Sequence, residues 1–118
     1  MKTKEPKIFV SYTIRDGKVD KDFLLNLESF SIGYGCIYID LIHNDSENKQ
    51  VRVMKELSNS NVVIIIKTDD VYKSEWVNKE LNYAKESKIP IYELEYDELI
   101  NNKFLPITTC INHWSISN

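Results

Sequence analysis

The longest apolar run in this chain is Val62–Ile66, five aliphatic residues bounded by polar segments. A run of this length is typical of a strand that is buried on both faces, as in a parallel sheet covered by helices on each side. It is far shorter than the roughly 20 apolar residues that a membrane-spanning helix needs. We therefore expect an α/β sheet built around this strand, and no membrane partner.

Short apolar runs alternate along the chain with segments of helical periodicity. We expect strands at residues 7–12, 36–40, 61–66, 89–94 and 107–111, and helices at 19–30, 46–58, 74–87 and 97–103. This alternation predicts right-handed βαβ units and a parallel sheet. The expected fold is a flavodoxin-like, doubly wound sheet of five strands in the order 2-1-3-4-5.

Size and charge limit the range of functions. A chain of 118 residues without a Gly/Pro-rich linker is expected to form one domain, 1–118. Its formal net charge is −3, and its charges are interleaved, which argues against a nucleic-acid partner. The charged N-terminus lacks an apolar signal region, so we expect a cytoplasmic protein. Cys36 and Cys110 form no metal-type cluster and are interpreted as buried, reduced thiols.

In sheets of this kind, ligands bind beyond the carboxyl ends of the strands. Three segments converge there, and the first is Ser11–Gly17, which offers hydroxyls, a glycine and the cation of Arg15. These groups could hold a phosphate or diphosphate. The alternative is a polar turn in which Asp16 or Asp20 caps the following helix.

The second segment, residues 40–50, is long for a strand-to-helix connection and rich in Asn, Asp and Ser. Long polar loops at the functional edge of a sheet are often mobile binding elements. His43 lies in this segment and is interpreted as a solvated histidine. No sequence neighbour suggests that it binds a metal or activates a nucleophile.

The third segment, residues 68–81, contains the most informative residue of the chain. Ser74 is expected to cap a helix on which Trp76 and Glu80 are i, i+4 neighbours. Glu80 borders the apolar stripe of that helix, so its carboxylate should be partly desolvated, which makes it a candidate active-site group. The alternative is an ordinary helix glutamate that pairs with a neighbouring side chain.

Together the three segments resemble the Toll/interleukin-1 receptor (TIR) domain. Ile8–Tyr12 is similar to the first box of the family, and Ile37–Asp40 is similar to the strand before its BB loop. Ser58–Ile66 resembles its helix-to-third-strand junction. Ser74–Leu81 resembles the helix of the NAD-cleaving TIR enzymes, including the spacing from Trp to Glu. The resemblance covers nearly the whole chain.

The resemblance implies a stand-alone bacterial enzyme, similar to the TIR subunits of Thoeris anti-phage systems, that cleaves NAD. Glu80 would be the catalytic carboxylate, stabilising positive charge on the ribose as nicotinamide leaves. No second carboxylate is clearly placed by the sequence to form an acid/base pair with it. The implied substrate-binding residues are Tyr12, Thr13, Arg15, Tyr38, Asp40 and Trp76. Trp76 would lie beside the nicotinamide riboside and Arg15 at the diphosphate; NAD is the substrate, and no metal or cofactor is needed.

The chain departs from the family pattern at three places. Thr13 and Ile14 stand where enzymatic relatives often carry basic residues, with Arg15 one position later. The 41–50 loop, through which self-association is expected, contains neither glycine nor proline. The family's final helix is expected to be shortened or absent.

The resemblance leaves the product open among ADP-ribose, a cyclic isomer of it, and ADP-ribose transferred to an acceptor. A separate effector protein would respond to this product in anti-phage defence. The competing interpretation is a non-catalytic TIR interaction module, such as an adaptor or a host-mimicking virulence protein. A third is an enzyme similar to the nucleoside deoxyribosyltransferases.

Overall fold

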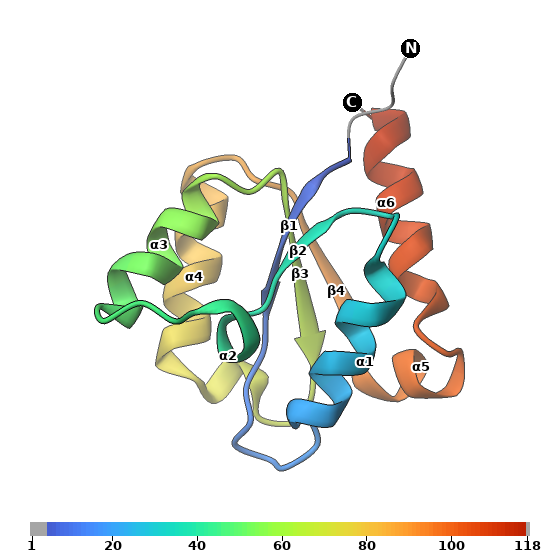
Figure 1. The fold of residues 1–118 in the computed structure, drawn as a ribbon, viewed down its shortest axis with the longest axis horizontal. Helices are drawn as coiled ribbons and strands as arrows, with labels where there is room; N and C mark the ends of the chain where they lie inside the picture. Colours follow the sequence, from blue (N-terminus) through green and yellow to red (C-terminus); the bar gives the residue numbers. More distant parts are fainter. Residues whose placement is uncertain (1–4, 118) are drawn as a thin grey trace.

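The computed structural model describes residues 5–117 and places a parallel sheet between two layers of helices (Figure 1). Within these residues the sheet has four strands: β1 (Lys7–Ser11), β2 (Cys36–Tyr38), β3 (Val62–Lys67) and β4 (Ile91–Glu95). Their order is β2-β1-β3-β4, and every neighbouring pair is parallel. The apolar run 62–66 forms most of β3, and no residue in it is more than 2% exposed.

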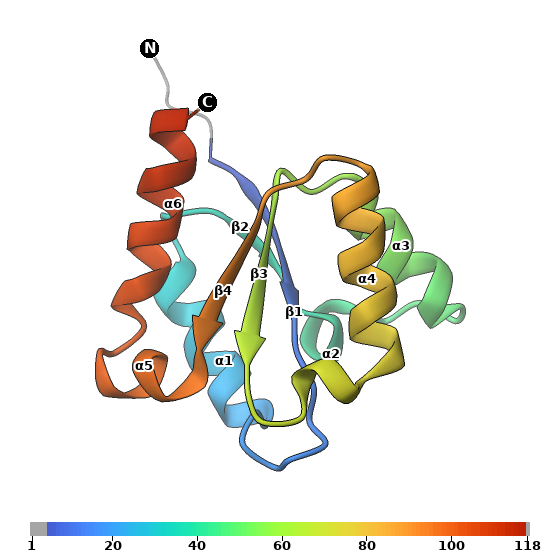
Figure 2. The ribbon, with the colours of Figure 1, turned by 180° about the vertical axis from the view of Figure 1, so that it is seen from behind.

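Helices cover both faces of the sheet, as Figure 2 shows from behind. One face is covered by α3 (Lys49–Ser58) and α4 (Glu75–Glu86). The other is covered by α1 (Lys21–Ser31), α5 (Tyr96–Asn101) and α6 (Leu105–Ser117). A four-residue helix, α2 (Asp40–His43), follows β2, and a 3-10 turn, η1 (Val71–Lys73), precedes α4.

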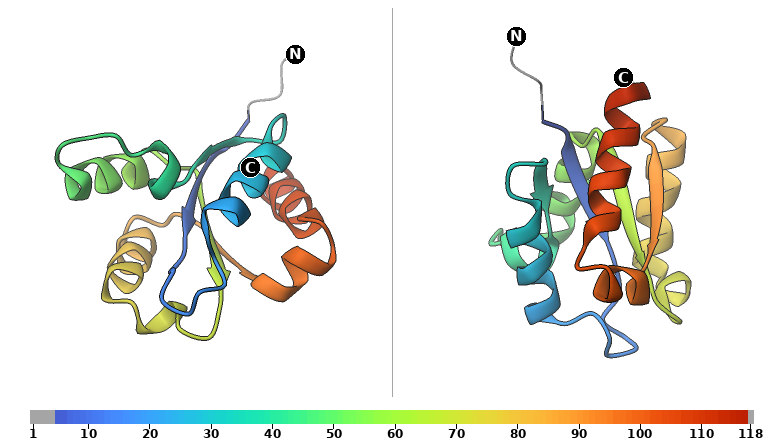
Figure 3. Two further views of the ribbon diagram at one scale, coloured as in Figure 1. Left: turned by 60° about the horizontal axis from the view of Figure 1, so that its bottom comes forward. Right: turned by 90° about the vertical axis from the view of Figure 1, so that its right-hand side faces the viewer.

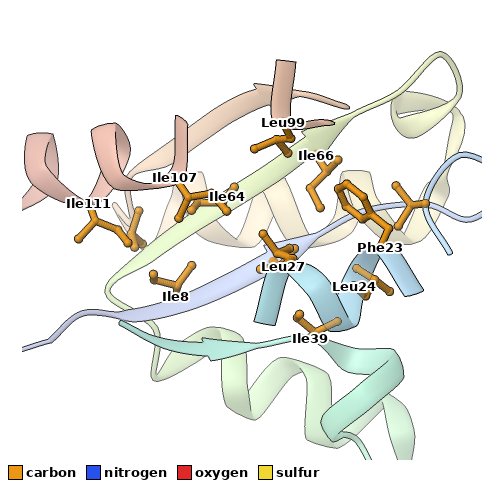
Figure 4. Packing of buried hydrophobic residues seen from close by; sticks show 13 residues of the cluster. Ile8, Phe23, Leu24, Leu27, Ile39, Ile64, Ile66, Leu99, Ile107 and Ile111 are labelled. Carbon is orange, nitrogen blue, oxygen red and sulfur yellow. The ribbon is translucent and has the colours of Figure 1, made fainter. Parts of the chain in front are cut away.

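The two faces of the sheet build two separate hydrophobic clusters. Successive side chains of a strand point to opposite faces, so β3 contributes to both clusters. Ile64 and Ile66 join the α1 and α6 side, which Figure 4 shows from close by. Val63 and Ile65 join the cluster beneath α3 and α4.

The expected fifth strand is wrong, because residues 107–111 lie inside α6. Ile107, Cys110 and Ile111 are buried on that helix at i, i+3 and i+4, which is helical spacing. The β-branched pair Thr108-Thr109 between them made the segment look strand-like. The sheet therefore follows only the 2-1-3-4 part of the expected order.

The final helix is present, since α6 has 13 residues, so the expectation that it is absent is wrong. Its buried Ile107 and Ile111 pack with side chains of α1 in the hydrophobic cluster on that side of the sheet, as Figure 4 shows. That face of the sheet is consequently covered and not open.

Side-chain caps fix the starts of the principal helices. Asp20 accepts a hydrogen bond of 2.8 Å from the Phe23 amide at the start of α1. Ser74 accepts one of 3.2 Å from the Val77 amide at the start of α4. The Ser74 cap was predicted from the sequence, and Asp20 was one of two candidates for the first cap, with Asp16. Each satisfies an amide that a helix leaves without a partner.

The two cysteines differ in their exposure to solvent. Cys110 is buried in α6, but Cys36 is exposed because it begins the edge strand β2. The expectation of two buried thiols is therefore wrong for Cys36. No helix within residues 5–117 is both long and apolar enough to cross a membrane.

Candidate active site

The connections that follow β1, β2 and β3 gather at the carboxyl edge of the sheet, which Figure 3 brings forward in its left view. Glu80 lies beneath this edge on α4, on the side of the helix that faces the sheet. Its residue is only 5% exposed, and the Ser11 hydroxyl at the end of β1 donates a hydrogen bond of 3.0 Å to its Oε1. Glu80 is therefore a buried group held from the sheet, unlike an ordinary helix glutamate.

Burial controls the ionisation of Glu80. Desolvation raises its pKa from an ordinary 4.5 to about 8, against the opposing hydrogen bond from Ser11. This value already includes a smaller raising effect from the negative charge of Asp40 and a lowering effect from the Trp76 indole. At neutral pH this environment therefore favours the neutral carboxylic acid.

A cavity of about 260 Å³ opens above Glu80. It is lined by residues of β1, the loop that follows it, the start of α2 and the first turns of α4: Val10, Tyr12, Thr13, Ile14, Asp40, Leu41, Trp76 and Glu80. Of the predicted site residues, Tyr12, Thr13, Asp40, Trp76 and Glu80 thus meet in one cavity. They come from positions up to 68 apart in the chain, and the parallel sheet brings them together.

The start of α2 forms one wall of the cavity. The Leu41 amide donates a hydrogen bond of 3.0 Å to the Tyr12 hydroxyl across the two loops. The Asp40 carboxylate accepts hydrogen bonds from the Tyr38 hydroxyl at 3.0 Å and from the Asn44 amide group at 2.6 Å. Burial raises the pKa of Tyr12 to about 12, so this phenol stays neutral. The loop after β1 and the start of α2 are therefore joined by a direct hydrogen bond.

Asp40 is the second carboxylate that the sequence did not clearly place beside Glu80. It lines the same cavity, and its charge acts on the Glu80 pKa. The signal was present in the chain, because the ends of neighbouring parallel strands must meet at one edge of the sheet. The sequence analysis did not predict the short helix α2, which begins at Asp40 and places it in the cavity lining.

Tyr38 was predicted to line the pocket, but it does not line this cavity. Its ring stacks on Phe9, with centroids 5.7 Å apart, and lies 5.7 Å from the Arg52 guanidinium. Its hydroxyl reaches the site only through Asp40. The Tyr38 ring instead belongs to the hydrophobic cluster beneath α3 and α4.

Arg15 also lies outside the cavity lining. Its Nη1 donates a hydrogen bond of 3.1 Å to the Lys73 carbonyl, at the turn before α4. Nearby, Asp16 accepts a hydrogen bond of 3.0 Å from the Asp70 amide. The first loop is therefore fastened to the segment that leads into α4, a contact between distant segments that the sequence did not reveal.

The lining is suited to a ligand that is aromatic and positively charged. Two carboxyl groups and an indole face the cavity, and none of the residues described as lining it is a lysine or arginine. The ammonium of Lys79 lies 5.0 Å from the centroid of the Trp76 ring, so this indole already makes one cation–π contact. Residues 5–117 contain no group of three or more His, Cys, Asp or Glu side chains arranged to hold a metal ion.

Residues 9–100 match the family model described as Thoeris protein ThsB, TIR-like domain. The chain belongs to this family. The matched range contains every residue that lines the cavity, whereas α6 lies beyond it.

Two curated proteins are similar to this chain over part of their length. A Methanobrevibacter olleyae protein, assigned as a probable 2′ cyclic ADP-D-ribose synthase, TcpO, is 32% identical over 107 residues, which is 81% of this chain. A Cytobacillus dafuensis protein, assigned as a candidate cyclic ADP-D-ribose synthase, TIR2, is 29% identical over 84 residues, or 67% of this chain. The matches span only 30% and 22% of those two proteins.

Proposed function

We propose that this TIR-like domain cleaves NAD at the bond between nicotinamide and ribose, with Glu80 as the charge-stabilising carboxylate. The observation that carries the proposal is the placement of Glu80: it is buried, held by Ser11 and open to a cavity that also contains Trp76. Membership of the ThsB TIR-like family and the names of the two relatives support it.

The charge of the substrate explains how a group with a raised pKa can serve this role. The nicotinamide ring of NAD is cationic, and a cation beside a buried carboxyl favours its ionised form. Binding should therefore draw Glu80 into its anionic state. As the glycosidic bond breaks, its electron pair leaves with neutral nicotinamide, and the positive charge moves to the ribose. The Glu80 carboxylate is then positioned to stabilise that charge.

The names of the relatives support a cyclic isomer of ADP-ribose as the product. Cyclisation requires that a nucleophile of the same molecule attacks the ribose carbon and loses a proton, in place of water. Asp40, in the same cavity, is our candidate for orienting that nucleophile or the ribose hydroxyls. An anti-phage role, with a separate effector that responds to the product, is proposed from the Thoeris name of the family.

The test is to incubate the protein with NAD and to follow nicotinamide and nucleotide products by chromatography and mass spectrometry. We expect nicotinamide release, and a fall of about 100-fold or more in Glu80→Gln, the size of loss typical for a key electrostatic group. Gln preserves the shape of the side chain and can still accept the Ser11 hydrogen bond. The absence of nicotinamide release at any protein concentration would contradict the proposal.

A non-catalytic interaction module is the second candidate. It is favoured by two exposed apolar side chains at the rim of the cavity, Ile14 and Leu41, which are 59% and 49% exposed. Such residues at a loop edge suit a protein partner. Under this alternative the chain would bind a partner through the rim without releasing nicotinamide, and Glu80→Gln would leave that binding unchanged.

A further inference from the structure

His43 is not the solvated residue that the sequence suggested. It is the last residue of α2, its side chain is 28% exposed, and both ring nitrogens have partners. Nδ1 accepts a hydrogen bond of 2.8 Å from the Ile39 amide. Nε2 contacts the Glu28 carboxylate of α1, whose side chain is 31% exposed.

These contacts define the state of the imidazole. A nitrogen that accepts a hydrogen bond carries no proton, so the ring proton lies on Nε2 and is donated to Glu28. The side chain thus forms a bridge from α1, through the ring, to the backbone at the end of β2. Ile39 is completely buried, which fixes that end of the bridge in the core.

The helix α2 has other contacts besides this bridge. Hydrogen bonds from Tyr38 and Asn44 hold Asp40, the Leu41 amide bonds the Tyr12 hydroxyl, and Ile42 packs against the hydrophobic cluster of α1 and α6. The helix contains four residues, none of them buried, and its N-cap, Ile39, provides no side-chain hydrogen bond. A helix of one turn is unstable by itself, because nucleation costs more than one turn returns. Its first two residues, Asp40 and Leu41, nevertheless line the cavity that also contains Glu80. The position of that wall must therefore come from contacts with the rest of the domain.

We infer that His43, held by Glu28, is a positioning residue that keeps Asp40 and Leu41 in place in the cavity wall. It does not touch the cavity itself, since it is absent from its lining. Glu80 is positioned independently, by α4 and Ser11. Loss of the bridge should consequently loosen substrate binding more than it slows the chemical step. This kinetic consequence rests on the proposed function, but the structural consequence does not.

The structural test is amide hydrogen exchange at Leu41, whose N–H is bonded to the Tyr12 hydroxyl. We expect faster exchange at Leu41 in His43→Ala than in the wild type, with unchanged exchange in β3. Asn at position 43 carries an oxygen where Nδ1 lies, so His43→Asn should recover part of the protection. The nitrogen-15 signals of the imidazole should show a protonated Nε2 and an unprotonated Nδ1.

The kinetic test is the nicotinamide-release assay. We expect KM to rise about fivefold or more in His43→Ala, the factor that one lost hydrogen bond supplies, with kcat changed less than about twofold. Glu28→Gln keeps an acceptor for Nε2 and should stay close to the wild type, whereas Glu28→Ala should raise KM. The matched control is His113→Ala. His113 lies on α6, its Nδ1 is 2.8 Å from the Tyr92 hydroxyl, and it is outside the cavity lining.

Unchanged exchange at Leu41 in both His43→Ala and His43→Asn would overturn the inference, whatever the kinetics. A fall in kcat with unchanged KM would also overturn it. If the wild-type protein released no nicotinamide, the proposed function would fail, but the exchange experiment would still decide whether His43 positions the wall.

Discussion

The Ser11 hydroxyl donates a hydrogen bond of 3.0 Å to the Glu80 carboxylate, joining two residues that are 69 positions apart. Ser11 ends β1, and Glu80 lies on α4, so this contact connects the sheet to the helix at the base of the cavity. It also supplies a donor to a carboxyl group that is otherwise desolvated. The ionisation of Glu80 should therefore respond to changes at Ser11.

We predict that Ser11→Ala raises the pKa of Glu80 above its present value of about 8. The Ser11 hydrogen bond stabilises the charged carboxylate, and its removal leaves burial less opposed. A carbon-13 NMR titration of the Glu80 carboxyl measures this directly. A lower pKa in Ser11→Ala would contradict the geometry described.

Folding stability should depend on pH through Glu80. Its pKa is 4.5 in an ordinary environment and about 8 in the folded protein, so between these values the folded state binds a proton that the unfolded state lacks. The contribution of the neutral acid to stability is complete below about pH 4.5 and is lost as pH rises to about 8.

Glu80→Gln removes this titration and keeps the shape of the side chain. The melting temperature of Glu80→Gln minus that of the wild type should increase from about pH 5 to about pH 8 and then level off. The other titrating groups are common to both proteins and should largely cancel in this difference. A difference that does not change with pH would show that the folded carboxyl titrates normally.

Binding of a cationic nicotinamide ring should release a proton from Glu80 near neutral pH. The positive ring favours the carboxylate, whereas burial of Glu80 by itself favours the neutral acid. Calorimetric titration with a carbocyclic NAD analogue, which keeps the cationic ring but is not cleaved, should give heats that depend on the ionisation enthalpy of the buffer. Glu80→Gln should show no comparable buffer dependence.

The helix α6 should behave as part of the core. Ile107 is 1% exposed, so Ile107→Ala should lower the free energy of unfolding by about 2–5 kcal/mol. Ile116 lies on the same helix but is 87% exposed, so Ile116→Ala should change it by less than about 0.5 kcal/mol. Denaturant unfolding of the two variants provides the measurement. Equal losses would argue against the buried position of Ile107.

The sequence predicted the features that depend on local patterning. The apolar run Val62–Ile66 indicated a strand buried on both faces, and Asp20 and Ser74 indicated helix starts. The placement of Glu80 at the border of an apolar stripe indicated partial desolvation. Periodicity and capping involve residues a few positions apart, so they can be read before the fold is known.

The sequence by itself thus determined the parallel α/β architecture and the carboxylate at its edge. Only the tertiary structure decided that residues 107–111 form a helix, that Arg15 and Tyr38 lie outside the cavity lining, and that His43 reaches Glu28. A short segment with mixed apolar and β-branched residues takes its form from the surface it must cover. Likewise, a side chain in a loop points where its distant partners lie, and those partners meet only when the chain has folded.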